Sequence, residues 1–411
     1  MGKKRKYIWA IGEELPNIDD HSLVKLEIIE RYIAIYLKFL TKNPHSSELK
    51  LTIVDGFAGG GIYKKDIMGS PLRIKKAVEE TQIEINVERE KNKFKSINNF
   101  DIDYIFIEKD IHTFKFLKKA LSDFDYMCNK TQCIHGLFSQ NLPNIIKHIK
   151  NKSRAEKSIF ILDQYGYADA PIKDIHYIFQ NLHKAEVILT FSVDSLIDYL
   201  SLENYSILQN QGLSKEECEK LLDVRQDDNF SREKIQPLLY QTIVQASGAP
   251  YYTPFFIKST VSNRAYWLFH FSSHPTARDE MMKLHWDKQN TFQHFGKAGL
   301  KMLIGYESES KNSLFEFDNF AKQQSIITLS KELPPMIRNL QEISFDQLKN
   351  CIINDTPATV DIIKESLNNS IETGEISIMS YDKTSKRRKF TTIRPNDIIK
   401  WRGKQQTHFI F

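Results

Sequence analysis

Cysteine is scarce in this sequence, and the few cysteines are not clustered. Four cysteines occur in 411 residues, and no two of them form a CxxC pair. Zinc ribbons, iron–sulfur motifs and disulfide scaffolds all depend on such clusters, so the sequence argues against each of them. Four histidines fall between positions 270 and 294, but no acid or cysteine completes a metal-ligand spacing there. We expect no metal site.

Long hydrophobic runs are also missing. No stretch approaches about 18 uncharged apolar residues, and the basic N-terminus MGKKRKYIW leads into no apolar segment of the kind that signal peptides carry. Hydrophobic residues make up 41% and aromatic residues 11% of the chain, which is enough to bury a core and excludes disorder for most of it. We therefore expect a soluble, cytoplasmic protein of two or three domains.

An alternation of apolar and helix-length segments begins near residue 46. Strands are predicted at 50–55, 102–108, 131–136, 158–163 and 185–191, with helices at 70–80, 110–121, 140–150 and 171–183. Strands separated by helices predict a parallel sheet with crossover helices. Two further apolar segments, 251–259 and 265–273, are joined by a short turn and predict an antiparallel hairpin. A doubly wound sheet that ends in a hairpin resembles the methyltransferase form of the Rossmann architecture.

The pattern divides the chain into four segments. We predict an N-terminal helical segment (1–45), a methyltransferase-like Rossmann domain (46–290) with a polar helical insertion at about 200–248, a connector (291–340) and a winged-helix domain (341–411). The last assignment rests on two helices, at 345–354 and from Thr356-Pro357 to Gly374, followed by the strand-like pieces ISIMS and FTTIR.

The segment VDGFAGGGIY, Val54 to Tyr63, is the most informative motif. An apolar strand delivers Asp55, and three glycines follow at positions that permit positive φ and close approach of the backbone to a ligand. The spelling D-x-F-x-G-x-G matches the loop that holds the methionine part of S-adenosylmethionine, and no GK[ST] of a phosphate-binding loop is present. A purely structural turn is the alternative. The predicted cofactor residues here are Asp55, Phe57, Gly59, Gly60 and Gly61.

Two other strand ends carry candidate cofactor contacts. Glu108 ends the second strand, where a carboxylate can accept hydrogen bonds from both ribose hydroxyls. Its distance from the glycine loop, 47 residues after Gly61, exceeds the usual spacing of about 20, and a simple strand cap is the alternative. Ser139, after the third strand, is placed near the adenine by the sheet pattern alone.

The segment FILDQYGYADAP ends the fourth strand and predicts the acceptor site. In methyltransferases that act on amines this position carries D-P-P-Y, N-P-P-Y or D-P-F-G. Asp163, Tyr165 and Gly166 match that pattern, but Gln164 replaces the proline that fixes the direction of the carbonyl. We interpret Asp163, Tyr165 and Gly166 as the catalytic residues, and a polar strand end before a helix is the alternative.

Basic residues gather at the end of the chain. The net charge of the whole chain is only +5, but nine basic residues stand against two acidic ones between Ser380 and Phe411. The run Lys386, Arg387, Arg388 and Lys389 would form the tip of the wing and contact phosphates. A solvated loop is the alternative.

Taken together, these motifs resemble the three-Cys-motif partner (TcmP) family. The resemblance is carried by ELPNIDDHSLVKLEIIERYI, VDGFAGGGIY, GSPL at 69–72, FIEKD, LDQYG and the tail region. HSLVK and GSPL are its distinctive parts, because ordinary methyltransferases lack them. The family name implies a partner protein that bears a three-cysteine motif. The resemblance therefore supplies a fold and a partner rather than a reaction.

The sequence thus favours a methyltransferase that uses S-adenosylmethionine and N-methylates a nucleic-acid base, with Asp163 and Tyr165 orienting the amine of a flipped base. Two alternatives stay open. A degenerate methyltransferase fold could bind nucleic acid or a partner without catalysis, as Gln164 permits. A nicotinamide-dependent oxidoreductase shares the glycine turn, but the hairpin and the D-x-F-x-G-x-G spelling disfavour it.

Overall fold

The computed structural model describes residues 7–403 except for these segments: 98, 165–167, 193–195, 199–207, 210, 227–231, 259–264, 289–292, 295–297 and 301–314. The chain divides into two compact units, Met1–Glu280 and Met281–Phe411, and the division falls within helix α10 (Pro275–Asp287).

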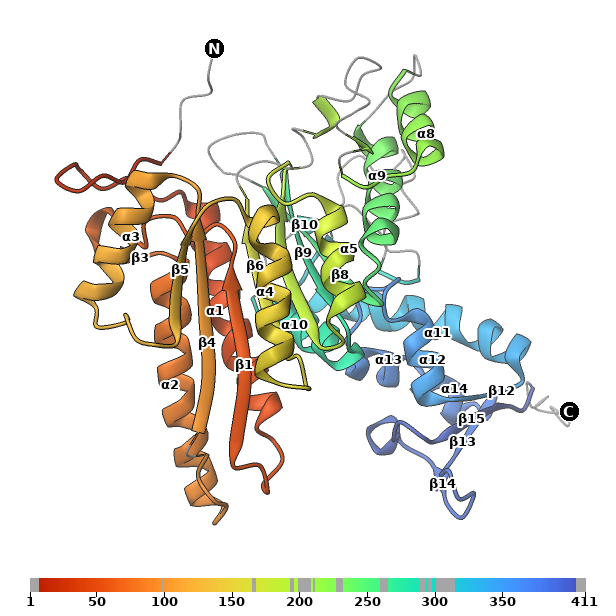
Figure 1. Ribbon diagram of the computed structural model, residues 1–411. Helices are drawn as coiled ribbons and strands as arrows, with labels where there is room; N and C mark the ends of the chain where they lie inside the picture. Colours follow the sequence, from red (N-terminus) through yellow and green to blue (C-terminus); the bar gives the residue numbers. More distant parts are fainter. Residues whose placement is uncertain are drawn as a thin grey trace, which may run out of the picture. The chain divides into compact units, whose positions relative to one another are not determined.

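A seven-stranded sheet forms the centre of the first unit (Figure 1). Its strand order is β5-β4-β1-β6-β7-β9-β8, in which the first five strands are parallel and β9 runs antiparallel to both β7 and β8. The strands are β1 (Glu48–Asp55), β4 (Asn99–Glu108), β5 (Thr131–His135), β6 (Ser158–Asp163), β7 (Ala185–Phe191), β8 (Tyr251–Lys258) and β9 (Ala265–Ser272). The predicted fold class, a Rossmann-like methyltransferase sheet with a terminal antiparallel hairpin, is confirmed.

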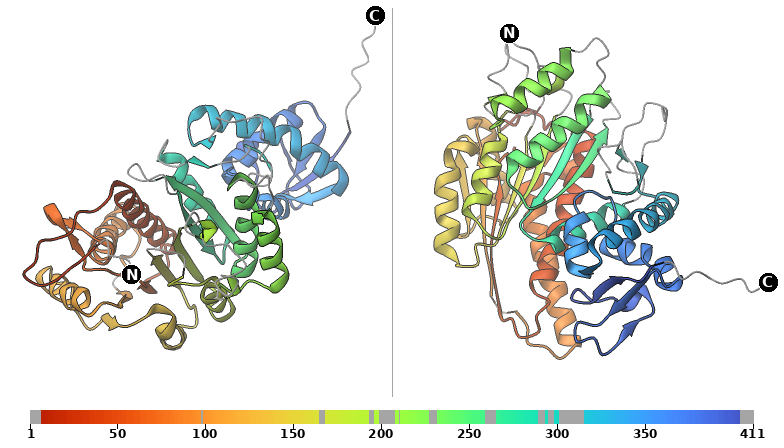
Figure 2. Two further views of the ribbon diagram at one scale, coloured as in Figure 1. Left: turned by 90° about the horizontal axis from the view of Figure 1, so that it is seen from above. Right: turned by 90° about the vertical axis from the view of Figure 1, so that its right-hand side faces the viewer.

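Burial on both faces explains why the central strands could be recognised. Every residue of β7 is buried, as are the last five residues of β1. A strand covered on both faces reads as a continuous apolar run rather than as an alternating one. Helices α4 (Phe138–Lys152) and α5 (Ile172–Asn181) cover one face of the sheet, and α1 (Asp20–Leu40) and α10 cover the other (Figure 2).

Helices α1 and α2 (Ser70–Lys91) of the first unit differ from the sequence expectation. Helix α1 packs into this unit, where Tyr32, Ile33 and Leu37 are buried. Helix α2 runs eleven residues beyond the predicted end, and its N-cap is Gly69. Helix α3 (Ile111–Asp123) lies as expected.

The predicted insertion at 200–248 contains part of the core. Helices α8 (Lys215–Gln226) and α9 (Arg232–Ser247) lie there, and α9 packs on α5 as the crossover helix that leads into β8. Leu239, Tyr240 and Ile243 are buried at helical spacing. This packing face was difficult to recognise in the sequence, because polar residues interrupt it and the helix contains Pro237.

The second unit is built around a four-stranded antiparallel sheet of order β12-β15-β13-β14. Its elements are α11 (Asn319–Leu340), β12 (Glu342–Ser344), α12 (Phe345–Ile352), α13 (Val360–Ser366), α14 (Asn368–Glu372), β13 (Ile376–Met379), β14 (Lys386–Arg387), the 3-10 helix η3 (Phe390–Thr392) and β15 (Ile398–Trp401). Helices and strands share one core, in which Leu348, Ile363 and Ile399 are fully buried. The winged-helix expectation is confirmed at the level of fold.

Three details of this unit differ from the sequence expectation. The predicted connector, 291–340, contains α11, whose Leu333 and Ile337 belong to the core of this unit. The second helix begins at Val360, because the Thr359 hydroxyl accepts a hydrogen bond from the Ile362 amide and caps it. FTTIR is not a strand: Thr391 and Thr392 lie in η3 and Ile393 is its C-cap. The partner strands of β13 are β14 and β15.

Among the described residues, no helix is both long and apolar enough to cross a lipid bilayer.

Candidate functional site

Three acids meet where the order of strands reverses. Strand β1 lies between β4 and β6, and Asp55, Glu108 and Asp163 are the last residues of these three parallel strands. In open sheets of this kind, ligands bind outside the carboxyl ends of the strands at the reversal point. The structure therefore brings together three residues that the sequence analysis selected from separate motifs.

Asp55 has an unusual environment for a carboxyl group. Its side chain is fully buried, and Oδ1 accepts a hydrogen bond from the Phe57 amide at 3.1 Å. Oδ2 is buried without any hydrogen-bond partner. Burial, with smaller repulsion from Asp163 and Glu108, raises the pKa of Asp55 to about 7. A buried acceptor oxygen that lacks a donor is what a cationic or hydrogen-bond-donating ligand would satisfy.

The glycine loop has positive φ at two of its glycines and is held by hydrogen bonds from both sides. Gly59 and Gly61 have φ values of +62° and +84°, in the left-handed region that disfavours other residues. The Gly59 amide donates to Glu108 Oε2 at 3.1 Å, which ties the loop to β4. The Gly69 amide donates to the Gly61 carbonyl at 2.7 Å, so the GSPL segment closes the loop from its other side.

Trp9 covers the glycine loop and was missed by the sequence analysis. A Cβ atom on Gly60 would lie 2.3 Å from Cγ of Trp9, and one on Gly59 would lie 3.3 Å from the indole. The indole nitrogen donates to the Ile62 carbonyl at 2.6 Å, and Tyr63 packs edge-on at 5.2 Å between ring centroids. Trp9 is therefore part of this site.

Glu108 is both a loop anchor and a candidate ribose ligand. Its Oε1 accepts the Asp110 amide at 2.8 Å, in addition to the Gly59 amide on Oε2. Burial raises the pKa of Glu108. Each carboxylate oxygen can accept more than one hydrogen bond, so this anchoring leaves capacity for hydroxyl groups of a ligand.

Asp163 is paired with a lysine that the sequence analysis did not select. Lys25 of α1 is 5% exposed and donates its ammonium group to Asp163 Oδ1. Lys25 is the lysine of HSLVK, a motif that the sequence marks as distinctive. The sequence did not show that this lysine pairs with Asp163. Gln164, which replaces the expected proline, is also buried and accepts the Ala170 amide at 2.9 Å.

The remaining predicted residues are only partly placed. Tyr165 and Gly166 lie outside the described residues. The Ser139 hydroxyl donates to Asp174 Oδ2 of α5, so it has a protein partner. Phe57 is half-buried, and its ring lies 6.2 Å from that of Phe138. In the described ranges no three His, Cys, Asp or Glu side chains gather as a metal site would require.

The residues of this site fit S-adenosylmethionine. Asp55, Glu108 and Asp163 are three acids near one buried base, Lys25, and an excess of carboxylates suits a ligand that carries a sulfonium and an ammonium group. Asp55 Oδ2 would accept a hydrogen bond from the methionine part, and Glu108 would accept hydrogen bonds from the ribose hydroxyls. The Gly59–Gly61 backbone would lie along the ligand.

The raised pKa of Asp55 predicts how stability changes with pH. Because the pKa of Asp55 is about 7 in the folded protein and the ordinary pKa of an Asp side chain is 3.8, the folded protein holds a proton between these pH values that the unfolded chain has lost. Raising the pH through this window should therefore lower the free energy of unfolding, by on the order of 1 kcal/mol per pH unit. Urea unfolding of the parent and of Asp55→Asn checks this. From pH 4 to pH 7 the free energy of unfolding of the parent should fall relative to that of Asp55→Asn. A difference between the two proteins that stays constant with pH would contradict the raised pKa of Asp55.

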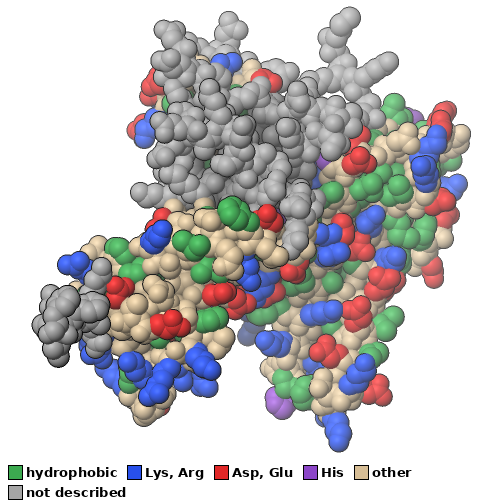
Figure 3. Space-filling model, turned by 180° about the vertical axis from the view of Figure 1, so that it is seen from behind, with side chains coloured by type: hydrophobic (Ala, Val, Ile, Leu, Met, Phe, Trp, Pro, Cys, Tyr) green, Lys and Arg blue, Asp and Glu red, His purple; other side chains and the backbone are tan. Residues whose placement is uncertain are grey.

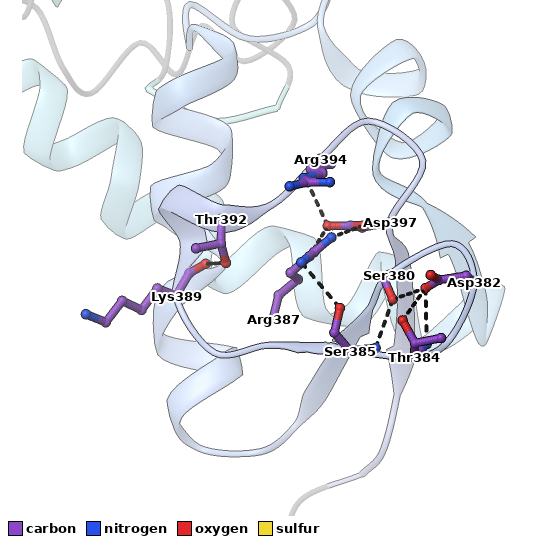
Figure 4. Close-up of polar contacts among 9 residues, drawn as sticks. All are labelled: Ser380, Asp382, Thr384, Ser385, Arg387, Lys389, Thr392, Arg394 and Asp397. Carbon is purple, nitrogen blue, oxygen red and sulfur yellow. Dashed lines mark hydrogen bonds and ion pairs between the residues drawn. The ribbon is translucent and has the colours of Figure 1, made fainter.

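The second unit carries the predicted nucleic-acid residues, and they do not share one environment. Lys386, Arg388 and Lys389 are exposed. Arg387 instead forms a bidentate ion pair with the buried carboxylate of Asp397, at 2.7 Å from Nε to Oδ2 and 3.1 Å from Nη2 to Oδ1 (Figure 4). The Asp397 carboxylate raises the pKa of Arg387. Lys386 and Arg387 also lie in β14 rather than at the loop tip.

One family model matches part of this chain. A family model described as the GMT-like wHTH domain matches residues 305–383. No curated protein matches the sequence significantly.

Similar solved structures include three methyltransferase-type proteins. A putative caffeoyl-CoA O-methyltransferase from Staphylococcus aureus is 17% identical, covering 62% of this chain and 85% of that one, with a TM-score of 0.29. An rRNA methylase from Streptococcus thermophilus is 9% identical, covering 60% and 95%, at 0.29. M. jannaschii TYW2, solved in complex with AdoMet, is 11% identical, covering 62% and 76%, at 0.30. These are likenesses of fold, and an activity has to be argued from the residues of the site.

Proposed function

We propose that this chain is a methyltransferase that uses S-adenosylmethionine and acts on nucleic acid. The observation that carries the proposal is the buried, unpartnered Oδ2 of Asp55 beside the glycine loop and Glu108. A structural turn needs no such oxygen, whereas a ligand with donor groups would satisfy it. The winged-helix domain supports nucleic acid as the substrate class.

The chain's own residues would act mainly by positioning. The bound cofactor would supply the electrophilic methyl group. Glu108 and the glycine loop would hold the cofactor, and Asp163 would accept a hydrogen bond from the methyl acceptor with its second carboxylate oxygen. Alignment of the reacting groups can itself account for much of an enzyme's rate enhancement. An exocyclic base amine is the acceptor that the sequence favours, and a three-Cys-motif protein is the partner that the family resemblance suggests.

One observation favours a second candidate, a binding module without catalysis. The Lys25 ammonium already binds Asp163 Oδ1, one of the two carboxylate oxygens on which an acceptor amine could bind. A cation there competes with an amine substrate and weakens the acceptor. In this alternative the fold binds nucleic acid or a protein partner and transfers no methyl group.

A transfer assay with the Glu108→Ala variant tests the proposal. Charged hydrogen bonds contribute about 1.5–3 kcal/mol each, so loss of the ribose contacts should weaken S-adenosylmethionine binding at least about tenfold. Radiolabelled methyl transfer from the cofactor to total cellular nucleic acid should be detected with the parent and fall with the variant at subsaturating cofactor. Glu48→Ala, on the exposed start of β1, is the matched control and should behave as the parent. Cofactor binding without any transfer would favour the binding module.

A further inference from the structure

The recognition helix of the winged-helix domain has the wrong charge for a nucleic-acid groove. In a helix-turn-helix the second helix normally enters the major groove, and here that helix is α13, extended by α14. Its inner face is buried through Ile362, Ile363 and Leu367. The residues left on its outer side include Asp361, Glu365 and Glu372.

The one basic residue of these two helices does not offset those acids. From Val360 to Glu372 there are three acidic residues and one lysine. That lysine, Lys364, is half-buried, and its ammonium lies 5.7 Å from the centroid of the Phe345 ring. Duplex DNA carries a phosphate charge for about every 1.7 Å of its axis, so a helix with three carboxylates on its outside would be repelled.

The wing has the opposite charge and a fixed shape. From Ser380 to Lys389 five basic residues stand against Asp382. Asp382 accepts from the Ser380 and Thr384 hydroxyls and from the Thr384 amide, and these hydrogen bonds lower its pKa to about 2. The acid is therefore committed to shaping the turn of the wing (Figure 4).

The Arg387–Asp397 pair fixes the direction of one wing side chain. Successive side chains of a strand point to opposite sides, and in the two-residue strand β14 Arg387 points to Asp397 of the same unit, so Lys386 points away from that pair. Lys386 is exposed, and so are Lys383, Arg388 and Lys389, which lie outside the strand. Figure 3 shows Lys and Arg side chains gathered at the lower left in that view, on the second unit.

We propose that this domain binds nucleic acid through the exposed basic residues of its wing, Lys383, Lys386, Arg388 and Lys389, and that its recognition helix reads no bases. The inference rests on the nucleic-acid part of the proposed function and names the surface. Contacts to phosphates fix position without reading sequence. Binding by this domain is therefore independent of sequence, and Tyr381, whose side chain is 75% exposed beside the wing, adds an uncharged ring contact.

Two charge variants of the full chain distinguish the wing from the helix. The wing variant changes Lys386, Arg388 and Lys389 to Ala and keeps Arg387, which holds the fold. The helix variant is Asp361→Asn, Glu365→Gln and Glu372→Gln. Each alters three charges on exposed or half-exposed side chains, so thermal unfolding should stay close to that of the parent. Affinity for several 20-base-pair duplexes of unrelated sequence is measured between 50 and 300 mM NaCl.

The wing variant should reduce the slope of log affinity against log salt by about 2 to 3, since each lost phosphate contact removes about 0.9 on duplex DNA. The helix variant should keep the parent's slope and its affinity within about twofold. Tyr381→Ala should weaken binding and leave the slope unchanged, because its ring carries no charge. The parent should bind the different duplexes with similar affinity.

Other outcomes separate failure of this inference from failure of the proposed function. The parent could prefer one duplex sequence, and the helix variant could change that preference while the wing variant keeps the parent's salt slope. This result would overturn the wing assignment but not the proposal that the protein binds nucleic acid. A parent that binds no duplex and no single strand at any salt concentration would overturn both, and would make the wing a surface for an acidic protein.

Discussion

Gly59→Val should reduce the affinity for S-adenosylmethionine by on the order of a hundredfold or more, which corresponds to about 2.7 kcal/mol. The backbone at Gly59 has φ of +62°, which a β-branched residue does not adopt without strain. Relief of that strain would move the amide away from Glu108 Oε2 and would push the new side chain toward the Trp9 indole. The loop would then lose its anchor on β4 and its cover at the same time.

A matched control separates the effect of the position of Gly59 in the cofactor loop from the general effect of placing valine at a positive φ. Gly374 also has a positive φ, +73°, but it lies just after the C-cap of α14 in the second unit. Gly374→Val should destabilise its own domain and leave cofactor affinity unchanged. The shift in melting temperature on adding S-adenosylmethionine reports binding in each folded variant. A full ligand-induced shift in Gly59→Val would show that this loop does not hold the cofactor.

Breaking the Lys25–Asp163 pair should have the largest effect on stability at the site. Removing one partner of a fully buried ion pair is destabilising by about 3–5 kcal/mol. The Lys25 side chain is 7% exposed and that of Asp163 is 25% exposed. Because water reaches Asp163, we expect a smaller loss, about 2–3 kcal/mol, for Lys25→Met in urea unfolding.

A double-mutant cycle assigns that loss to the pair. Lys25→Met combined with Asp163→Asn should be less destabilising than the sum of the single changes, with a coupling energy of about 1–2 kcal/mol. Lys38→Met, on the same helix, breaks an exposed pair with Glu84 and should change stability by less than about 0.5 kcal/mol. Additive single effects would mean that Lys25 is held by its apolar surroundings instead.

The fold was predictable from the sequence because its signals are local. The central strands are buried on both faces and read as apolar runs, and the hairpin of β8 and β9 follows from two such runs separated by a short turn. Helix α9 was harder, because polar residues interrupt its packing face and its partner α5 lies far away in the sequence.

The site was only partly predictable, because its decisive contacts are not local. Lys25 and Asp163 are 138 residues apart, and Trp9 reaches the carbonyl of Ile62 across 53 residues. Sequence patterns place acids and glycines at strand ends, but they do not show which distant side chain approaches them. The same limit applies to the wing, where counting charges could not show that Arg387 is committed to Asp397.

Isothermal titration of the full chain with S-adenosylmethionine tests the central claim most directly. The claim is that the glycine loop, Asp55 and Glu108 form a cofactor site, and Asp55 Oδ2 is the buried oxygen that a ligand would satisfy. We expect binding of one cofactor per chain, with affinity that rises as the pH passes about 7 and Asp55 ionises. The absence of any heat of binding at pH 8 would contradict the account and leave the first unit without a cofactor.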